Sequence, residues 1–256
     1  MERKKFLTRS LGITGLGTVL IDACRKTEVS DSSSSASTTT TDGDCTVSPT
    51  ETEGPFPYTT DGTTKSEIAN PLNRSDIRTN SSDGAIQTGL PLSVVITVVN
   101  VNNSCALVSN ARVDIWHCNE VGYYSGYANQ NGGLSGLAIS YLGQNWLRGY
   151  QLTDTSGGAK FTTIYPGWYQ GRATHIHFEV YVNNVMMKTT QLTFPEIISD
   201  AVHVTTLYSA HGINPIRNAS DSVFGDSATD LAKEIFTMNG DTTNGYTATH
   251  RIGISI

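Results

Sequence analysis

The sequence predicts an all-β protein. The 256-residue chain is rich in Gly, Thr, Ser and Asn, which favour turns, and 8% of its residues are aromatic. No long segment carries apolar residues at helical spacing, whereas several short runs are β-branched or alternate between apolar and polar residues. With 38% hydrophobic residues, the chain has enough apolar side chains for the core of one large all-β domain or two small domains.

The charge of the chain argues against one class of partner. Its formal net charge is −6, its pI is about 5.4, and no cluster of Lys and Arg occurs beyond the extreme N-terminus. Nucleic-acid binding proteins usually carry a basic patch or stripe. The sequence therefore predicts no nucleic-acid partner.

Residues 1–24 have the layout of an export signal: a basic opening, then an apolar run from Leu11 to Ile21. This run is too short to span a bilayer as a permanent helix. The start Arg3-Lys-Lys-Phe-Leu resembles a twin-arginine signal with Lys as its second basic residue, and a general secretory signal fits equally well. Ile21-Asp-Ala-Cys24 resembles a bacterial lipobox with atypical residues, the alternative being a cleaved signal with an incidental cysteine.

Residues 25–44 are low-complexity and rich in Ser and Thr, which predicts a tether between a lipid anchor at Cys24 and one folded domain of residues 45–256. The protein would then be periplasmic or at the cell surface, with the lipid anchor as its only membrane contact. Export would permit one internal disulfide, and the sequence does not select the pair. Three cysteines remain for it: Cys45, Cys105 and Cys118.

The first half of the domain combines extended segments with loops. Thr52-Glu-Gly-Pro-Phe-Pro-Tyr58 predicts a rigid extended segment rather than a strand interior. The apolar run from Leu92 to Val101 predicts a strand buried on both faces, and the alternation from Ala111 to Asn119 predicts a second strand. A Tyr- and Gly-rich loop then covers 121–127, and residues 128–143 form a long loop of the kind that is usually functional or mobile.

The second half begins with the stretch that contains most of the candidate chemistry, from Arg148 to Val182. Residues 174–182 predict a strand, residues 183–184 a turn, and residues 185–194 the returning strand of a hairpin. One short helix is expected over Asp230–Met238, where apolar residues recur at helical spacing. The last segment, Tyr246–Ile256, alternates and predicts a closing strand.

Two histidines on one strand indicate a metal site. Alternation places His175 and His177 on one face and the apolar residues between and after them on the other, so two imidazoles are held side by side. Such a pair is a stronger signal for a ligand pair than a lone histidine. The remaining histidines lack this spacing and are expected to have ordinary polar or capping roles: His117, His203, His211 and His250.

The residues around this pair are tyrosines rather than the carboxylates or cysteines of common zinc sites. Glu179 lies on the histidine face but one step farther along, and Asp154 is expected in a turn. Two imidazoles with two phenolates would favour a hard trivalent ion such as Fe(III). Alternatively, the tyrosines are amphipathic residues at the rim of the fold. The candidates are Tyr123, Tyr124, Tyr127 and Tyr169.

Five motifs occur in the same order as in a known enzyme family. They are Thr52-Glu-Gly-Pro-Phe; Val113-Asp-Ile-Trp-His-Cys-Asn with Gly122-Tyr-Tyr-Ser-Gly; Arg148-Gly-Tyr-Gln-Leu-Thr-Asp; Phe161-Thr-Thr-Ile-Tyr-Pro-Gly-Trp-Tyr; and Gly171-Arg-Ala-Thr-His-Ile-His-Phe. Together they make residues 45–225 resemble the intradiol ring-cleavage dioxygenases, which include catechol 1,2-dioxygenase and protocatechuate 3,4-dioxygenase. The resemblance implies a β-sandwich of two mostly antiparallel sheets with long active-site loops and little helix.

The resemblance also implies a site and a reaction. The non-haem Fe(III) ligands would be Tyr124, Tyr169, His175 and His177, and Tyr169 would leave the metal when substrate binds. Arg172 would stabilise negative charge on the substrate. A catechol-type substrate and O2 would react to give a cis,cis-muconate-type diacid, with no organic cofactor.

Two features depart from the cytoplasmic family members. The linker Gln170–Thr174 between the second tyrosine and the histidines is short, which predicts a lower pocket wall. The chain also begins with a signal and tether instead of a helical dimerisation segment, so substrate and oligomeric state do not transfer. Extracellular or lignin-like aromatics, or catechols too large for a closed pocket, would suit an exported enzyme. The alternative function is a non-catalytic exported lipoprotein that binds a ligand or partner and retains the metal motif.

Overall fold

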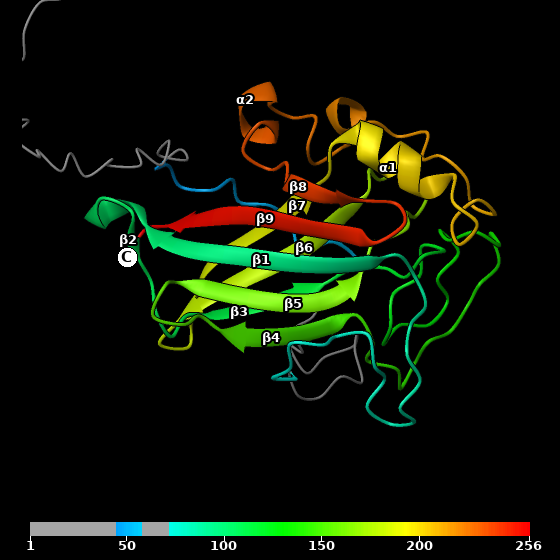
Figure 1. Ribbon diagram of the computed structural model, residues 1–256, viewed down its shortest axis with the longest axis horizontal. Helices are drawn as coiled ribbons and strands as arrows, with labels where there is room; N and C mark the ends of the chain where they lie inside the picture. Colours follow the sequence, from blue (N-terminus) through cyan, green and yellow to red (C-terminus); the bar gives the residue numbers. More distant parts are fainter. Residues whose placement is uncertain (1–44, 58–71) are drawn as a thin grey trace, which may run out of the picture. The chain divides into compact units, whose positions relative to one another are not determined.

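The computed structural model describes residues 45–57 and 72–256, so the predicted export signal, tether and lipid anchor lie outside the described residues. Two β-sheets are stacked face to face, as Figure 1 shows. Short helical segments lie outside the sandwich. The expectation of an all-β sandwich with two mostly antiparallel sheets and little helix is confirmed.

The first sheet has five strands. Its path is β2 (Ala106–Leu107), β1 (Pro91–Asn100), β9 (Gly245–Ile254) and β8 (Thr237–Asp241), and β5 (Gly158–Ile164) also pairs with β1. All pairings in it are antiparallel except that of β1 with β9, which is parallel. The expected closing strand thus lies beside the first strand of the chain.

The second sheet has four antiparallel strands. Their order is β4 (Arg148–Leu152), β3 (Arg112–Trp116), β6 (His175–Val182) and β7 (Val185–Thr193). The predicted hairpin is confirmed: β6 and β7 are joined at Asn183 and Asn184, both of which have the positive φ that asparagine tolerates in tight turns. The central position of β6 fixes its side chains from both neighbouring strands.

The core fills the space between the sheets with alternating apolar side chains from both inner faces. Fully buried examples are Val94, Ile96 and Phe161 from the first sheet and Val113, Ile115, Phe178 and Val180 from the second. The outer face of β1 is only half covered, since Ser93, Val95 and Thr97 remain partly exposed. The prediction that both faces of this strand would be buried is therefore wrong for the outer face.

The helix expected over residues 230–238 is also wrong. The α-helix α2 covers only Ala228–Leu231, and the strand β8 begins at Thr237. Between them, the N–H of Phe236 donates to the carbonyl of Thr193, and the N–H of Thr193 donates to the carbonyl of Glu234. This pairing with the end of β7 holds the segment extended, so tertiary hydrogen bonds override the helical spacing of its apolar residues.

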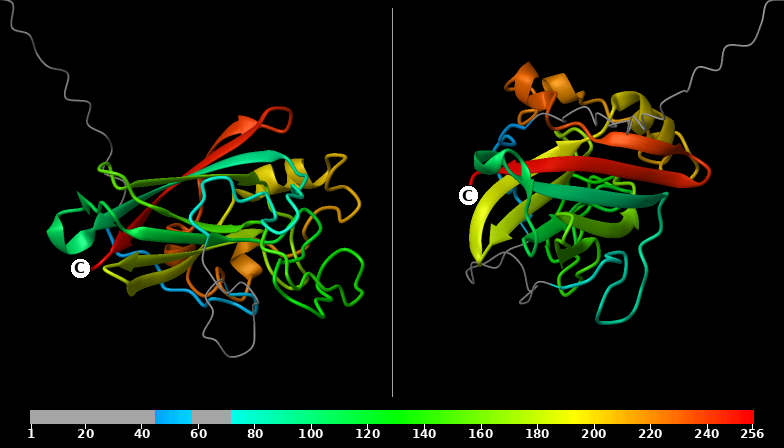
Figure 2. Two further views of the ribbon diagram at one scale, coloured as in Figure 1. Left: turned by 90° about the horizontal axis from the view of Figure 1, so that it is seen from below. Right: turned by 60° about the vertical axis from the view of Figure 1, so that its left-hand side comes forward.

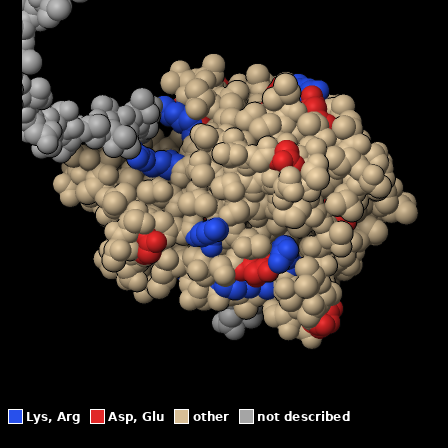
Figure 3. Space-filling view, viewed as in Figure 1, with Lys and Arg blue, Asp and Glu red and all other residues tan. Residues whose placement is uncertain are grey.

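Long loops gather at one end of the sandwich. The loop between β3 and β4 lies at the same end as α1 (Glu196–His203) and the segment that follows it, as the left view of Figure 2 shows. A disulfide joins Cys45 to Cys105, and Cys118 is free and buried. The face in Figure 3 has few charged side chains, with acidic groups among the basic ones. Within the described ranges, no helix is long and apolar enough to cross a membrane.

A buried carboxyl next to β8 makes stability depend on pH. Glu234 is 0% exposed, and its carboxyl lies beside that of Glu51. Burial, reinforced by the neighbouring carboxylate of Glu51, raises the pKa of Glu234 to about 8. The folded protein therefore holds a proton that the unfolded chain releases above its ordinary pKa of 4.5.

We expect the Tm to fall as pH rises from 5 to 9, because the stabilisation from protonated Glu234 is complete below 4.5 and is lost as pH rises through about 8. One pKa unit corresponds to about 1.4 kcal/mol, or roughly 3–6 °C for a domain of this size, since each kcal/mol shifts the Tm by about 2–4 °C. Replacing Glu234 by Gln should remove most of this dependence. Thermal melts of both proteins across this pH range test it, and parallel curves would show that the carboxyl does not titrate as described.

Candidate active site

The two histidines lie at the start of β6, on the face of this strand that is directed away from the apolar core. Their strand neighbours Ile176 and Phe178 point into the apolar core, so the imidazoles point to the opposite face. His177 is opposite Trp116 on β3 and Gln191 on β7, and its ring stacks on the indole with 4.7 Å between centroids and 6° between planes. The alternation expected from the sequence is present, and the histidines are almost fully buried.

Tyr124 brings a phenol to the same point from the loop after β3. Its oxygen lies 3.3 Å from Nε2 of His175 and 3.3 Å from Nε2 of His177, and the two Nε2 atoms are 3.1 Å apart. The side chain of Gln130 fixes this tyrosine by accepting from its N–H and donating to its carbonyl. Three donor atoms, two from β6 and one from the loop after β3, thus converge in one nearly equilateral triangle.

The spacing of this triangle suits a metal ion. Ligands about 2.1 Å from one metal are roughly 3.0 Å apart at a right angle and about 3.4 Å apart in a tetrahedron. Nδ1 of His175 lies 2.6 Å from the carbonyl of Ala173, which places its proton there and leaves the lone pair on Nε2. Burial lowers the pKa of His175 to about 3 and that of His177 well below its ordinary value, so both imidazoles are neutral, the form that can bind a metal.

Tyr169 completes the group from the loop before β6. Its ring centroid is 5.8 Å from that of Tyr124 and 5.6 Å from that of His175. Burial raises the pKa of both phenols, and the charge of Arg172 opposes this rise at each of them. Ionising two buried phenols side by side requires a strong local cation, and a bound metal ion supplies one.

Arg172 is held by three side chains. Its Nε donates to the carboxylate of Asp221, its Nη2 lies 2.8 Å from Oε1 of Gln191, and its Nη1 lies 3.4 Å from the phenol oxygen of Tyr169. Although burial raises the pKa of Asp221, the guanidinium and backbone N–H groups outweigh it and keep that pKa low. Asp221 and Gln191 belong to none of the five motifs, so the sequence did not predict their part in the site.

The N-terminal arm, residues 45–57, forms one wall of the site. The ring of Phe56 stacks on that of Tyr124 at 4.8 Å and meets that of Tyr169 edge-on at 6.0 Å. Gly54, with φ of +71°, lies against His177 so closely that a Cβ there would be 3.2 Å from Cε1 of the imidazole. The sequence predicted only a rigid extended segment here, and the quoted Thr-Glu-Gly-Pro-Phe motif was the signal for a role in the site.

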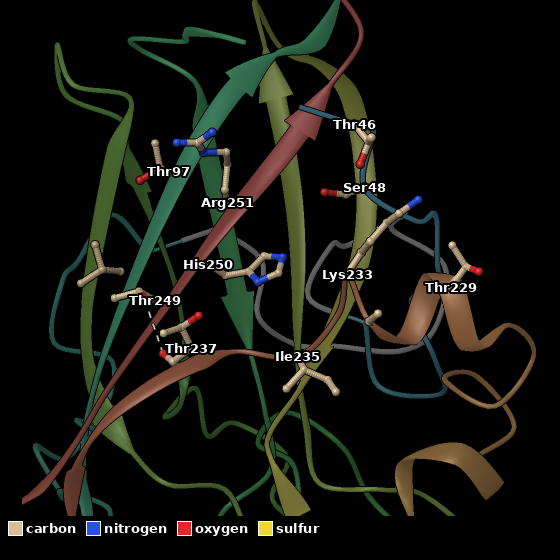
Figure 4. Close-up of a pocket in the computed structure, with 12 residues that line it drawn as sticks. Thr46, Ser48, Thr97, Thr229, Lys233, Ile235, Thr237, Thr249, His250 and Arg251 are labelled. Atoms are coloured by element: carbon tan, nitrogen blue, oxygen red, sulfur yellow. Dashed lines mark hydrogen bonds between the residues drawn. The ribbon is translucent and has the colours of Figure 1, made fainter. Parts of the chain in front are cut away.

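Of two cavities, only the smaller one is lined by a candidate ligand. A cavity of about 270 Å³ adjoins it, with Phe56, Tyr169, Gln170, Gln130 and Asn131 in its lining. A larger one of about 950 Å³ lies over β9 and the segment after α2, where Thr249, His250, Arg251 and Lys233 line it (Figure 4). None of the candidate ligands lines the larger cavity, whereas Tyr169 lines the smaller one.

The other acidic and histidine candidates lie apart from the triangle. Glu179 accepts a hydrogen bond from the hydroxyl of Tyr181, and Asp154 caps the turn before β5. His117 is buried and hydrogen-bonded to the hydroxyl of Thr163. Throughout residues 45–57 and 72–256, no group of three or more His, Cys, Asp and Glu side chains could hold a metal. A metal at the triangle would therefore depend on tyrosine.

Comparisons with known proteins agree with this geometry. A family model described as "Dioxygenase" matches residues 63–206, more than half of the chain. An intradiol ring-cleavage dioxygenase from Tetranychus urticae has a similar structure, with a TM-score of 0.66, 25% identity, and coverage of 82% of this chain and 95% of that chain. The chain belongs to the intradiol ring-cleavage dioxygenase family.

Dioxygenases of lower sequence identity share the fold. One is the dioxygenase domain of a carbohydrate-binding fusion protein from Streptomyces sp. SirexAA-E, with 22% identity, a TM-score of 0.54, and coverage of 82% of this chain and 99% of that domain. Another is 3-chlorocatechol 1,2-dioxygenase from Rhodococcus opacus 1CP, with 17% identity, a TM-score of 0.51, and coverage of 81% and 72%. No curated protein matches the sequence significantly. Members of this family generally use non-haem iron.

Proposed function

We propose that the protein is a non-haem Fe(III) dioxygenase that cleaves a catechol-type ring between its two hydroxylated carbons. Both atoms of O2 enter the product, a cis,cis-muconate-type diacid. The observation that carries the proposal is the triangle formed by the phenol oxygen of Tyr124 and the Nε2 atoms of His175 and His177. Tyr169 would be the fourth ligand, and Arg172 the charge-stabilising group.

The donor set fits ferric iron. Two neutral imidazoles and two phenolates are hard or borderline donors, and the phenolates offset two of the three positive charges. Fe(III) held by these residues would act as a Lewis acid that binds both catechol oxygens and makes the ring reactive toward O2. The stacking of Trp116 on His177 and the Ala173 carbonyl on His175 would keep the imidazoles in place during turnover.

Tyr169 is the ligand suited to leave. Its side chain is half-buried and lies at the cavity, whereas Tyr124 is fully buried. As a released phenolate, it would accept one of the two catechol protons, and the other would pass to solvent. Its phenol oxygen would then remain within reach of Nη1 of Arg172.

Arg172 would stabilise negative charge on the substrate. The guanidinium stays protonated at all working pH values, and it is fixed beside Tyr169 before substrate arrives. A fixed cation stabilises negative charge on a catecholate and on the ring as it is cleaved, with no reorganisation at the moment of reaction. The aromatic wall made by Phe56 and Tyr124 would pack against the substrate ring and exclude water.

Oxygen uptake by the iron-loaded protein tests this function. We expect one O2 consumed per catechol with both oxygen atoms in an intradiol product, measured with an oxygen electrode, 18O2 and mass spectrometry of the product. A panel of catechols of increasing size would identify the substrate. Extradiol products would contradict the proposed reaction. Iron-replete protein that consumes no O2 with any member of the panel would support the non-catalytic alternative.

We also propose that the protein is exported and anchored at Cys24. The disulfide between Cys45 and Cys105 supports an oxidising compartment, in which such bonds persist. Labelling with a fatty-acid probe should mark the full chain and not a Cys24→Ser variant. Equal labelling of both would contradict the anchor.

Gly54 offers a test of the wall beside His177. We expect Gly54→Ala to weaken iron binding on the order of tenfold, because the added methyl group would press on the imidazole. Gly84→Ala is a matched control: its φ of +74° imposes the same backbone strain, and no atom lies within 4 Å of the added Cβ. Iron titration of both variants separates the effect of backbone strain from that of the contact with His177. Equal iron affinities of the two variants would contradict the role assigned to Gly54.

A further inference from the structure

Asp221 is a buried carboxylate that is not part of any of the five motifs. It lies beyond residue 206, where the family model ends. Its side chain is 0% exposed and that of its partner Arg172 is 9% exposed. Nε of the arginine lies 2.9 Å from one carboxylate oxygen and 3.2 Å from the other. A buried ion pair of this kind is costly to form because both charges lose their hydration. It therefore matters for the site which edge of the guanidinium the carboxylate binds.

The carboxylate engages only one edge of the guanidinium. Because Asp221 takes the Nε position, the two terminal nitrogens of Arg172 point away from it. Nη2 reaches Gln191 and Nη1 reaches the phenol oxygen of Tyr169. An end-on pair through Nη1 and Nη2 would instead turn the charge away from the site. The edge that Asp221 binds therefore decides where the cation is presented.

The same carboxylate also holds the backbone between the arginine and the histidines. Its Oδ2 accepts from the N–H of Ala173 at 2.6 Å. The carbonyl of Ala173 in turn accepts from Nδ1 of His175 at 2.6 Å. Asp221 is thus connected to one charged side chain of the site directly and to one imidazole through a single residue.

The support for Asp221 is itself rigid. Its Oδ1 accepts from the N–H groups of Val223 and Phe224, which fixes the carboxylate in one rotamer. From the same segment, the side-chain amide of Asn214 donates to the carbonyl of Arg172. The ring of Phe224 lies 5.7 Å from the guanidinium carbon. Residues 214–224 therefore hold residues 172 and 173 from several directions.

We propose that Asp221 is a positioning residue that presents the guanidinium of Arg172 to Tyr169 and the substrate and, through Ala173, orients the imidazole of His175. The proposal rests on the proposed function, since it assigns Arg172 and His175 their roles in that site. It connects the C-terminal segment of the chain to the chemistry of a motif about fifty residues earlier. Mutating a residue that supports a metal ligand through hydrogen bonds typically changes metal affinity or activity by about 10–100-fold.

The test compares Asp221→Asn with a matched variant, Asp114→Asn. Asp114 is equally buried and accepts two hydrogen bonds from Arg112, but it lies outside the site. Both variants lose the charge of a buried pair. In crystal structures, we expect Arg172 to leave Tyr169 only in Asp221→Asn. With iron and catechol at saturation, kcat of this variant should fall by about 10–100-fold, with a smaller change in KM, while Asp114→Asn keeps its kcat.

The inference is overturned if Arg172 and Ala173 keep their positions in Asp221→Asn, or if its kcat matches that of the control. Should the Asn variant not fold, Asp221→Glu keeps the charge and shifts it by one methylene group; unchanged kcat there would also overturn the inference. Wild-type protein without iron or oxygen uptake would contradict the proposed function instead. The crystallographic comparison would still decide whether Asp221 positions Arg172.

Discussion

Replacing His177 by Ala should leave a protein that retains no ferric iron and shows no oxygen uptake with catechols. The variant loses one of three donor atoms that lie within 3.3 Å of each other, and it loses the ring that stacks on Trp116. The effect should exceed the roughly 10–100-fold losses caused by mutating a residue that only supports a metal ligand, because this change removes a proposed ligand itself. Metal analysis after iron loading and dialysis, followed by oxygen-electrode assays, gives the result.

His117→Ala is the control for this variant. His117 is also a fully buried imidazole, and burial lowers its pKa to about 4. Its Nε2 is hydrogen-bonded to the hydroxyl of Thr163 and is not part of the triangle. We expect it to lower the Tm while the protein keeps its iron. Retention of iron and activity by His177→Ala, or loss of iron by both variants alike, would contradict the ligand assignment.

Replacing Arg172 by Gln should lower kcat by about 10²–10³, while ferric iron stays bound. The side chain is not a ligand, but its Nη1 is the fixed positive charge beside Tyr169. Steady-state kinetics on iron-replete protein would show the loss mainly in kcat, because the guanidinium stabilises charge that grows during the reaction. Iron content measured on the same samples separates this effect from loss of the metal.

The Gln variant also leaves the carboxylate of Asp221 buried without its cation, which costs about 3–5 kcal/mol of stability. Arg112→Gln reproduces this cost, because it leaves the fully buried Asp114 without its cation at a distance from the site. We expect both variants to lose stability and only Arg172→Gln to lose turnover. An Arg172→Gln enzyme with wild-type kcat would show that the guanidinium has no part in the reaction.

The parts of the site that sequence could predict depend on local geometry or on motifs. Strand alternation alone placed His175 and His177 on one face, because side-chain direction in a strand is set by its period of two. The partner Tyr124 came from a loop about fifty residues earlier and required the family resemblance. No local pattern specifies that a loop folds back to within 3.3 Å of two imidazoles.

The remaining features depend on long-range packing. The disulfide between Cys45 and Cys105 and the ion pair of Arg172 with Asp221 join residues that only the closed sandwich brings together. The expected helix over residues 230–238 failed for the same reason, because the end of β7 offered hydrogen bonds that an isolated segment lacks. Periodicity describes one element at a time, whereas these contacts arise between elements.

The visible absorption spectrum of the iron-loaded protein tests the central claim most directly. Phenolate bound to Fe(III) gives a charge-transfer colour that histidine and carboxylate ligands alone do not give. We expect a broad visible band that is weakened in Tyr124→Phe, where Tyr169 remains as the one phenolate of the proposed site, and that shifts when a catechol is added without O2. Protein that binds one ferric ion per chain and remains colourless would contradict a site built from two tyrosines and two histidines.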